Sequence, residues 1–328
     1  MPAIEANTFL TYSAIGIRED LSDLISDISP TQTPFQSNIG SRTAENTYYE
    51  WQTDALAAAL ATPALEGQDL LTDMTAVTPT ARMGNYAQIN IVDFIISGTE
   101  QRVNKAGRSS EIGYQAAKAS KELKRNVEKA LLSNLAADAG NATTARVTAG
   151  LPAWIKTSVS KASDGVTPTW SGSFPSGAAG TGFRTDGTQA AFTETMLKTV
   201  MESVWTEGGE PSVLMVGGYN KQIVSGFSGI AEQRYNVKGD APTVIIGAAD
   251  IYVSDFGNLS VVPNRFQRAR DAFVYDPDEA KHAVLRPYQV DELAKTGDAS
   301  KRLVLVEGGL QVNNEKAFGI IADLTTSA

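Results

Sequence analysis

The sequence contains no cysteine and one histidine, and these two scarcities remove many routes to catalysis. Without a thiol there is no disulfide, no cysteine nucleophile and no thiolate metal site. With His282 alone, zinc sites and Ser–His–Asp arrangements have little to draw on. We interpret His282 as a surface residue at the end of a strand rather than as a catalyst.

Long hydrophobic runs are also missing. No stretch of about 18 apolar residues occurs, so we expect no membrane-spanning helix and no membrane partner. The first residues lack the basic region and apolar core of a signal peptide, which favours a protein made and used in a cytoplasm. Apolar residues still make up 42% of the 328 positions, enough for a core, and this length favours two intertwined domains.

The net charge of −9 is unevenly distributed along the chain. Residues 1–80 contain eleven acidic and two basic side chains, whereas residues 101–129 contain eight basic and three acidic ones. An acidic segment and a basic segment can attract each other, within one subunit or between subunits. Ordinary solvated surface charge is the alternative interpretation.

Residues 109–137 carry the clearest helical pattern, because apolar side chains recur at spacings of three and four. Lys124 and Glu128 are spaced to pair one turn apart, and Gly140-Asn141 can end the helix. The pattern predicts a rod about 42 Å long. Its apolar face is narrow and is expected to pack on a sheet, which leaves the basic face open.

The residues before this helix predict a short helix and two strands. Residues 18–29 show an amphipathic helical stripe that Pro30 ends, and residues 46–54 and 81–97 read as strands. The segment between the two strands is too long for a hairpin turn and has few turn signals. We predict an extended arm that a partner orders, with a plain disordered loop as the alternative.

The second half of the chain is dominated by strands. Residues 157–190 are rich in Gly, Ser and Thr and are predicted to form an insertion, loop or linker, with helices near 192–206 and 218–226. Because strands predominate late and no fixed repeat occurs, the fold class is α+β. The predicted strands are 212–216, 243–246, 250–254, 259–262, 272–275, 283–285, 302–306 and 309–324.

Two short motifs resemble ligand sites only superficially. Residues 276–279 gather carboxylates but lack the glycine and terminal glutamate of a calcium loop, so a turn with Pro277 at its second position is favoured. The glycines of residues 177–182 have no preceding strand and no following GK[ST], which argues against phosphate binding. We therefore predict no catalytic, cofactor or metal site.

Four features, in this order, resemble the major head proteins of tailed bacteriophages with the Hong Kong 97-type (HK-97-like) capsid fold. They are the opening ANTFLTYSAIGIREDLSDLISDISPTQTPFQSNIG, the strand YYEWQTD with its long loop and returning strand, the helix 109–137, and the ending EGGLQVNNEKAFGIIADL. The resemblance covers nearly the whole chain. None of the four is a catalytic signature.

The resemblance implies a structural major capsid protein, not an enzyme, located in the virion after assembly in the bacterial cytoplasm. Its copies would form the hexamers and pentamers of an icosahedral or prolate head shell. The implied partners are further copies of itself, scaffold and portal proteins, and double-stranded DNA enclosed without sequence-specific binding. The implied parts are an N-terminal arm at 1–40, an extended β-hairpin loop at 41–98, a peripheral domain with a long spine helix at 99–150 and 296–328, a Gly/Ser-rich insertion or loop at 151–190, and an axial domain at 191–295.

The residues also suggest how copies would meet. The acidic arm and loop of one subunit would lie across the basic helix of a neighbour, and Trp, Tyr and Arg side chains would anchor the contact because they concentrate interface energy. Each aromatic or Arg anchor could instead pack within its own subunit. The predicted interface residues are Tyr49, Trp51, Arg82, Tyr86, Lys121, Lys124 and Arg125.

Two other functions compete with this one. An elongated virion fibre, decoration or adhesion protein would account for the late strands, but it accounts poorly for a long early helix and the absence of repeats. A carboxylate-based glycan hydrolase stays open because the separation of carboxylates in space cannot be read from sequence. A closed shell would separate the capsid hypothesis from both.

Overall fold

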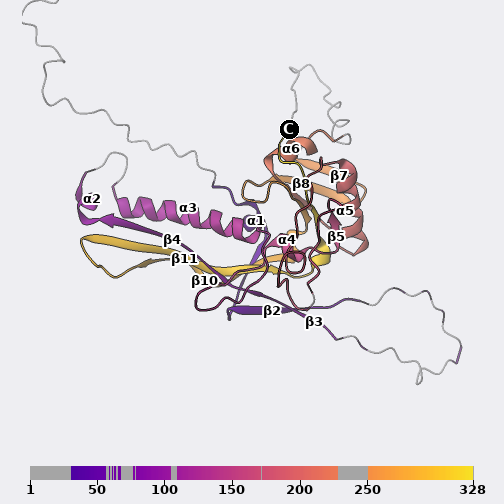
Figure 1. Cartoon of the computed structure of the whole chain (residues 1–328), viewed down its shortest axis with the longest axis horizontal. Helices are drawn as coiled ribbons and strands as arrows, with labels where there is room; N and C mark the ends of the chain where they lie inside the picture. The colour runs from indigo at the N-terminus through magenta and orange to yellow at the C-terminus, as the bar shows by residue number, and fades with distance from the viewer. Residues whose placement is uncertain are drawn as a thin grey trace, which may run out of the picture.

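The computed structural model describes residues 31–56, 79–104, 109–170, 172–227 and 250–327, together with a few isolated positions between 59 and 77. The described part is elongated, with a long helix and its sheet at one end and a second sheet with two helices at the other (Figure 1). The predictions for residues 18–29 and 243–246, and for most of 55–80, lie outside the described residues.

The long helix, α3 (Glu111–Leu131), packs along a four-stranded sheet. The Ser110 hydroxyl caps it by accepting a hydrogen bond from the Gly113 amide at 3.2 Å. The helix ends at Leu131, earlier than predicted, and spans about 32 Å. Beyond the helix, Asp138 forms an antiparallel bridge with Val147. Residues 132–137 connect the helix to this bridge and are not helical, contrary to the prediction. The strands of the sheet are, in order, β1 (Gly40–Thr43), β10 (Ala280–Glu292), β11 (Ala299–Val312) and β4 (Gln88–Ser97).

Three strands of the second sheet, β6, β9 and β12, are buried on both faces. Along β6, Val213 and Met215 join the main core under α3, whereas Leu214 and Val216 join a second core beneath α5 (Glu194–Thr206). A strand buried on both faces reads as a continuous apolar run. The strands are, in order, β5 (Ser158–Ser160), β12 (Phe318–Ile321), β9 (Ala272–Tyr275), β6 (Val213–Val216), β8 (Gly257–Pro263) and β7 (Ile251–Ser254).

A two-stranded hairpin of β2 (Tyr48–Thr53) and β3 (Ala81–Tyr86) leaves the body beside these sheets (Figure 1). The single strand predicted at 81–97 is therefore wrong, because β3 and β4 belong to different sheets. The break falls at Ala87, which is fully buried and donates its amide to the Thr47 carbonyl oxygen. This contact turns the chain from the hairpin into the body.

The end of the chain also differs from the prediction. The strands predicted at 302–306 and within 309–324 are joined in β11, which runs through Gly308 and Gly309 without a break. The break comes at a short 3-10 turn, η3 (Glu315–Ala317), after which β12 enters the other sheet. The strand predicted at 283–285 lies in the first half of the much longer β10.

The sheets do not follow the predicted domain boundary near residue 295. Strand β10 falls in the range given to the axial domain, yet it pairs with β11 in the α3 sheet. Strand β12 falls in the range given to the peripheral domain, yet it pairs with β9 and β5. The antiparallel β10–β11 pairing keeps both strands in one sheet, and the chain crosses to the other only after Val312.

The remaining short elements complete the described fold. They are α1 (Pro34–Asn38), α2 (Gly98–Arg102), α4 (Leu151–Trp154), α6 (Gly218–Val224) and η2 (Pro277–Glu279). The turn predicted at Pro277 is confirmed as η2, with the Asp276 carboxylate accepting the Asp278 amide. No helix in the described ranges is both long and apolar enough to cross a membrane.

Candidate functional site

The base of the β2–β3 hairpin has an inner and an outer face. The pairs Tyr48↔Tyr86 and Glu50↔Gly84 alternate with Tyr49↔Asn85 and Trp51↔Met83. Successive side chains point to opposite faces of a strand, so Tyr49, Trp51 and Asn85 share the inner face toward the core. Tyr48 and Tyr86 share the outer face.

Tyr49 and Trp51 are part of the subunit's own core. Tyr49 is 3% exposed, and its hydroxyl donates to the Leu310 carbonyl oxygen at 2.9 Å. Burial raises the pKa of Tyr49 far above its usual value, so it remains a neutral donor. The Trp51 ring lies 5.5 Å from the Trp154 ring. For these two residues the intramolecular alternative describes the packing, and they fasten the hairpin to the body.

Asn85 completes this attachment and was not singled out from the sequence. Its side chain is fully buried, and its amide nitrogen donates to the Leu310 carbonyl oxygen at 2.7 Å and to the Thr148 hydroxyl at 3.1 Å. Its amide oxygen accepts the Ala149 amide at 3.0 Å. A buried polar side chain with both ends satisfied fixes a unique geometry. Nothing in the local sequence distinguishes it from an exposed strand residue.

Arg82 and Tyr86 differ from the two core aromatics. The Arg82 side chain is 68% exposed and lies 3.7 Å from Glu50 across the hairpin. The Tyr86 side chain is half-buried, with its ring 4.9 Å from Tyr48 and 5.7 Å from Phe174. Of the four predicted anchors, Arg82 is thus the one that offers most of its side chain to a neighbour.

The basic side chains of α3 point away from the sheet. Lys121 and Lys124 are exposed, and the Arg125 guanidinium lies 5.5 Å from the centre of the Phe266 ring. The predicted Lys124–Glu128 pair is wrong, because Glu128 turns inward and is fully buried. This leaves Lys124 on an open face of the helix.

Glu128 instead forms a junction of three segments. One carboxylate oxygen accepts the Phe35 amide at 2.8 Å and the Asn264 side-chain amide at 2.7 Å, and the other accepts the Gln36 amide at 2.8 Å. It therefore fastens α1, near the start of the described residues, to the last turn of α3. Burial raises the pKa of Glu128, although the three donors favour its ionised form.

His282 is buried, which corrects its predicted place at the surface. The imidazole is 6% exposed because β1 adds to the outer side of β10 and pairs Ser41 opposite His282. The start of β10 is thus inside the sheet and not at its edge. Burial lowers the pKa of His282 to about 4 from the usual 6.5, so the side chain is neutral at neutral pH.

This burial predicts an acid-dependent loss of stability. The unfolded chain takes up the His282 proton near pH 6.5 and the folded chain only near pH 4, so stability falls as the pH drops between these values. The expected loss is about 3 kcal/mol. His282→Gln should remove this component. Urea unfolding of both subunits at steps from pH 7 to pH 4 measures it, and parallel stability curves would contradict the prediction.

This chain resembles known capsid proteins over nearly its whole length. The family model described as SU10 major capsid protein matches residues 4–325. The major capsid protein of Escherichia phage Phieco32 is 26% identical over 347 residues, which cover 95% of this chain and 96% of that protein.

Solved structures show the same fold at low sequence identity. A chain of the Cyanophage A-1(L) capsid asymmetric unit has a TM-score of 0.65 and 15% identity, with 96% of this chain and 98% of that one covered. A chain of Microbacterium phage Oxtober96 has a TM-score of 0.58 and 12% identity, with 93% and 96% covered. The predicted α+β class and its match to phage capsid folds are confirmed.

Proposed function

This chain belongs to the SU10 major capsid protein family, and we propose from this premise that its copies meet through an acidic arm laid across a basic helix. Membership makes it a structural component of the virion that forms the phage head shell, not an enzyme. The finer arrangement we propose is one of hexamers and pentamers around double-stranded DNA held without sequence-specific contacts. Scaffold and portal proteins are further proposed partners.

The observation that carries the arm contact is the open basic face of α3. Lys121, Lys124 and Lys129 are exposed, and the Lys118 side chain is 57% exposed beside Glu122. Such a face is free to receive an acidic segment. The sequence supplies that segment in residues 1–80, where acids outnumber bases eleven to two. Such a contact weakens with added salt, because exposed charges are screened.

The hairpin offers a second proposed contact. It leaves the body beside the sheets, and its two strands are tied to the core through Tyr49 and Asn85 (Figure 1). Arg82 on the same hairpin is exposed, which suits a contact with another copy. We propose that Tyr49, Trp51 and Tyr86 hold the hairpin in place and that Arg82 makes the contact.

The proposed domains are defined by which strands share a sheet as well as by the order of residues along the chain. Helix α3 with β1, β10, β11 and β4 forms the proposed peripheral domain, and α5 and α6 with the six-stranded sheet form the proposed axial domain. Residues 1–40 remain the proposed arm. Within 41–98, the β2–β3 hairpin is the proposed extended loop, whereas β1 and β4 at the ends of this range join the proposed peripheral domain. Residues 151–190 supply β5 to the axial sheet.

Charge reversal tests the arm contact. The triple variant Lys121→Glu, Lys124→Glu and Arg125→Glu is expected to reduce shell formation at least tenfold, because repulsion replaces attraction across the contact. The unassembled subunit should keep its circular dichroism spectrum and melt close to the wild type. Electron microscopy and light scattering of the assembled product measure the effect.

A matched control has the same change in net charge away from α3. Lys198→Glu, Lys295→Glu and Lys316→Glu alter exposed basic residues and should leave assembly intact. A second variant adds Asp20→Lys, Asp23→Lys and Asp27→Lys to the α3 triple and should restore shells by exchanging the two charges. Normal shells from the α3 triple alone would overturn the contact.

A further inference from the structure

Residues 161–188 contact the hairpin on the side away from the core. The Gly84 amide of β3 donates to the Ser173 carbonyl oxygen at 3.0 Å. The Phe174 ring meets the rings of Tyr48 and Tyr86 edge-on, at 5.7 Å from each. The hairpin is thus held from both faces, with β11 on the inner face and this loop on the outer.

The part of the loop that makes these contacts is tied to the body at two further points. The Pro175 carbonyl oxygen accepts the Ala137 amide at 2.9 Å. The Trp170 ring is 4% exposed, and its indole nitrogen donates to the Ala153 carbonyl oxygen at 3.1 Å. We call residue 170 together with residues 172–175 the tip of the loop.

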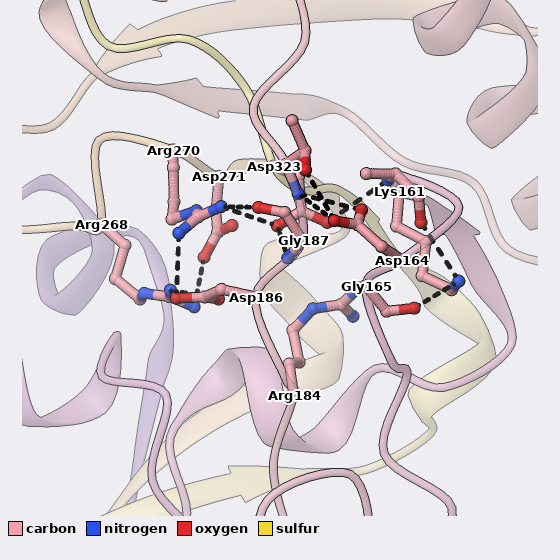
Figure 2. A network of polar contacts seen from close by, with 12 residues as sticks. Lys161, Asp164, Gly165, Arg184, Asp186, Gly187, Arg268, Arg270, Asp271 and Asp323 are labelled. Atoms are coloured by element: carbon pink, nitrogen blue, oxygen red, sulfur yellow. Dashed lines mark hydrogen bonds and ion pairs between the residues drawn. The ribbon is translucent and has the colours of Figure 1, made fainter.

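The two ends of the loop come together at Asp323, directly after β12 (Figure 2). One Asp323 carboxylate oxygen accepts the Gly187 amide at 2.8 Å, and the other accepts the Ala162 amide at 3.3 Å. Asp164 reinforces this closure by accepting the Thr188 amide at 2.9 Å and the Thr188 hydroxyl at 2.6 Å. We call this closure the neck.

At the neck, the backbone conformation allows the loop to lie close to Asp323. Asp323 is 2% exposed and has a φ of 61°, a left-handed conformation that Asp and Asn tolerate better than most residues. A Cβ on Gly165 would lie 2.6 Å from an Asp323 carboxylate oxygen. Asp323 adopts a strained backbone conformation and its side chain bonds both ends of the loop, so this residue holds the two ends of the loop together.

A network of charges lies beside the neck (Figure 2). Arg270 pairs with Asp323 at 3.0 Å and with Asp186 at 3.1 Å, and Arg268 pairs with Asp271 at 3.0 Å. Arg184, 3% exposed, is also enclosed here. Three Arg and three Asp side chains balance in charge, as buried charges require. The network joins the loop to the segment before β9 and to the chain after β12.

We propose that residues 161–188 act as a brace that sets the angle of the β2–β3 hairpin and that Asp323 is the residue that locks it. The neck is fixed to the six-stranded sheet through β12 and β9, and the tip is fixed to the outer side of the hairpin. The brace therefore couples the sheet to the hairpin. Asp323 is a positioning residue, since its contacts are with Ala162, Gly187 and Arg270 and not with the hairpin.

The surroundings of the tip explain why a lock at the neck is needed. An open hollow of about 610 Å³ lies beside Phe174 and is lined also by Tyr86, Phe183 and Leu135. Packing therefore leaves one side of Phe174 open, although Trp170 and Pro175 on either side of it are buried. With space available beside it, the position of Phe174 depends on how firmly the loop is held at its ends.

Amide hydrogen exchange in the unassembled subunit tests the brace. Asp323→Asn tolerates the left-handed backbone but keeps one acceptor and loses the charge that pairs with Arg270. It should raise the exchange rate of the Gly84 amide about tenfold. Amides of Val274 in β9 and Ile91 in β4 should keep their rates, which distinguishes release of the brace from a general loss of stability.

A double-mutant cycle completes the test. Phe174→Ala should also raise the Gly84 rate, and combining it with Asp323→Asn should add less than the product of the two effects, because both act through the same loop. Asp164→Asn, at the exposed part of the neck, provides a milder second variant. Faster exchange at Gly187 and Ala162 with an unchanged Gly84 rate would overturn the proposal. The readout lies within one subunit and is independent of the arm contact proposed above.

Discussion

Replacing Glu128 with Leu is expected to lower the free energy of unfolding by on the order of 3 kcal/mol and to detach α1 from α3. The variant removes the acceptor of three donors, namely the Phe35 and Gln36 amides and the Asn264 side chain. Each buried donor left without a partner costs about 1–3 kcal/mol. Gln36 is only partly buried, so solvent can satisfy its amide, and the total stays below the sum of three full penalties.

Glu128→Gln separates the loss of the acceptors from the loss of the charge. Gln retains one oxygen but presents an NH₂ group where the carboxylate accepted a hydrogen bond, so it is expected to lose about half as much stability as Leu. Burial raises the pKa of Glu128, so the charge itself is not the main source of stability. As the pH falls through this raised pKa toward 4.5, the free energy of unfolding of the wild type should rise relative to that of the Gln variant. The reason is that the folded carboxyl binds its proton before the unfolded one does.

Chemical denaturation of the unassembled subunit measures these differences, and hydrogen exchange at the Phe35 and Gln36 amides localises them. Lys124→Leu is the matched control, because Lys124 lies on the same helix one turn away and is exposed. It is expected to change stability by less than about 0.5 kcal/mol. If the Leu variant at position 128 falls in the same range, Glu128 does not hold the junction.

Position 128 also shows which features of α3 can be predicted from the sequence and which cannot. The period of apolar residues predicts α3 and its buried stripe, and the structure confirms Leu123, Val127 and Leu131 in the core. The period does not reveal that Glu128 lies on the buried side, because the spacing to Lys124 also fits a surface ion pair. The backbone amides that donate to Glu128 come from a segment more than 90 positions away along the chain, which no local pattern records.

The assignment of each strand to one of the sheets cannot be predicted from the sequence either, for a related reason. Alternation and apolar runs predict most of the strands near their observed places, including β2, β6 and β9. Which strands pair is decided by long-range packing, so the separation of β3 from β4 and the crossing of the chain before β12 were not predicted. The candidate site shares this limit, because Tyr49 and Arg82 look equally suited to an interface until their exposure is known.

Replacing Gly309 with Val is expected to displace the β2–β3 hairpin and to abolish shell formation, with a loss of about 3–5 kcal/mol in the free energy of unfolding. Gly309 lies in β11 beneath the base of the hairpin. A Cβ at this position would lie 2.5 Å from the Thr148 hydroxyl oxygen, 2.5 Å from the Tyr49 hydroxyl oxygen and 2.8 Å from the Tyr86 carbonyl oxygen. One of the three is backbone, so rotation of side chains alone cannot relieve the overlap.

The hairpin must therefore move away from β11, and this movement breaks the bonds that fix it. The Tyr49 hydroxyl and the Asn85 amide both donate to the Leu310 carbonyl oxygen, at 2.9 and 2.7 Å. Both side chains are buried, so each lost bond leaves a polar group without a partner. The strand itself tolerates Val well, because β-branched residues favour extended backbone. The loss therefore comes from the contact and not from the local conformation.

A second glycine, outside the strands, supplies the control. Gly297 lies between β10 and β11, and a Cβ there would have no heavy atom within 4 Å, so Gly297→Ala should fold and assemble as the wild type does. Gly309→Ala should fall between wild type and Val, because it adds the overlapping atom without the branches. Denaturation of the unassembled subunits and electron microscopy of the assembled product follow the series. Shells in normal yield from the Val variant would show that the hairpin can hold its position without contact at Gly309, and the attachment through Tyr49 and Asn85 would then have to be sought elsewhere along β11.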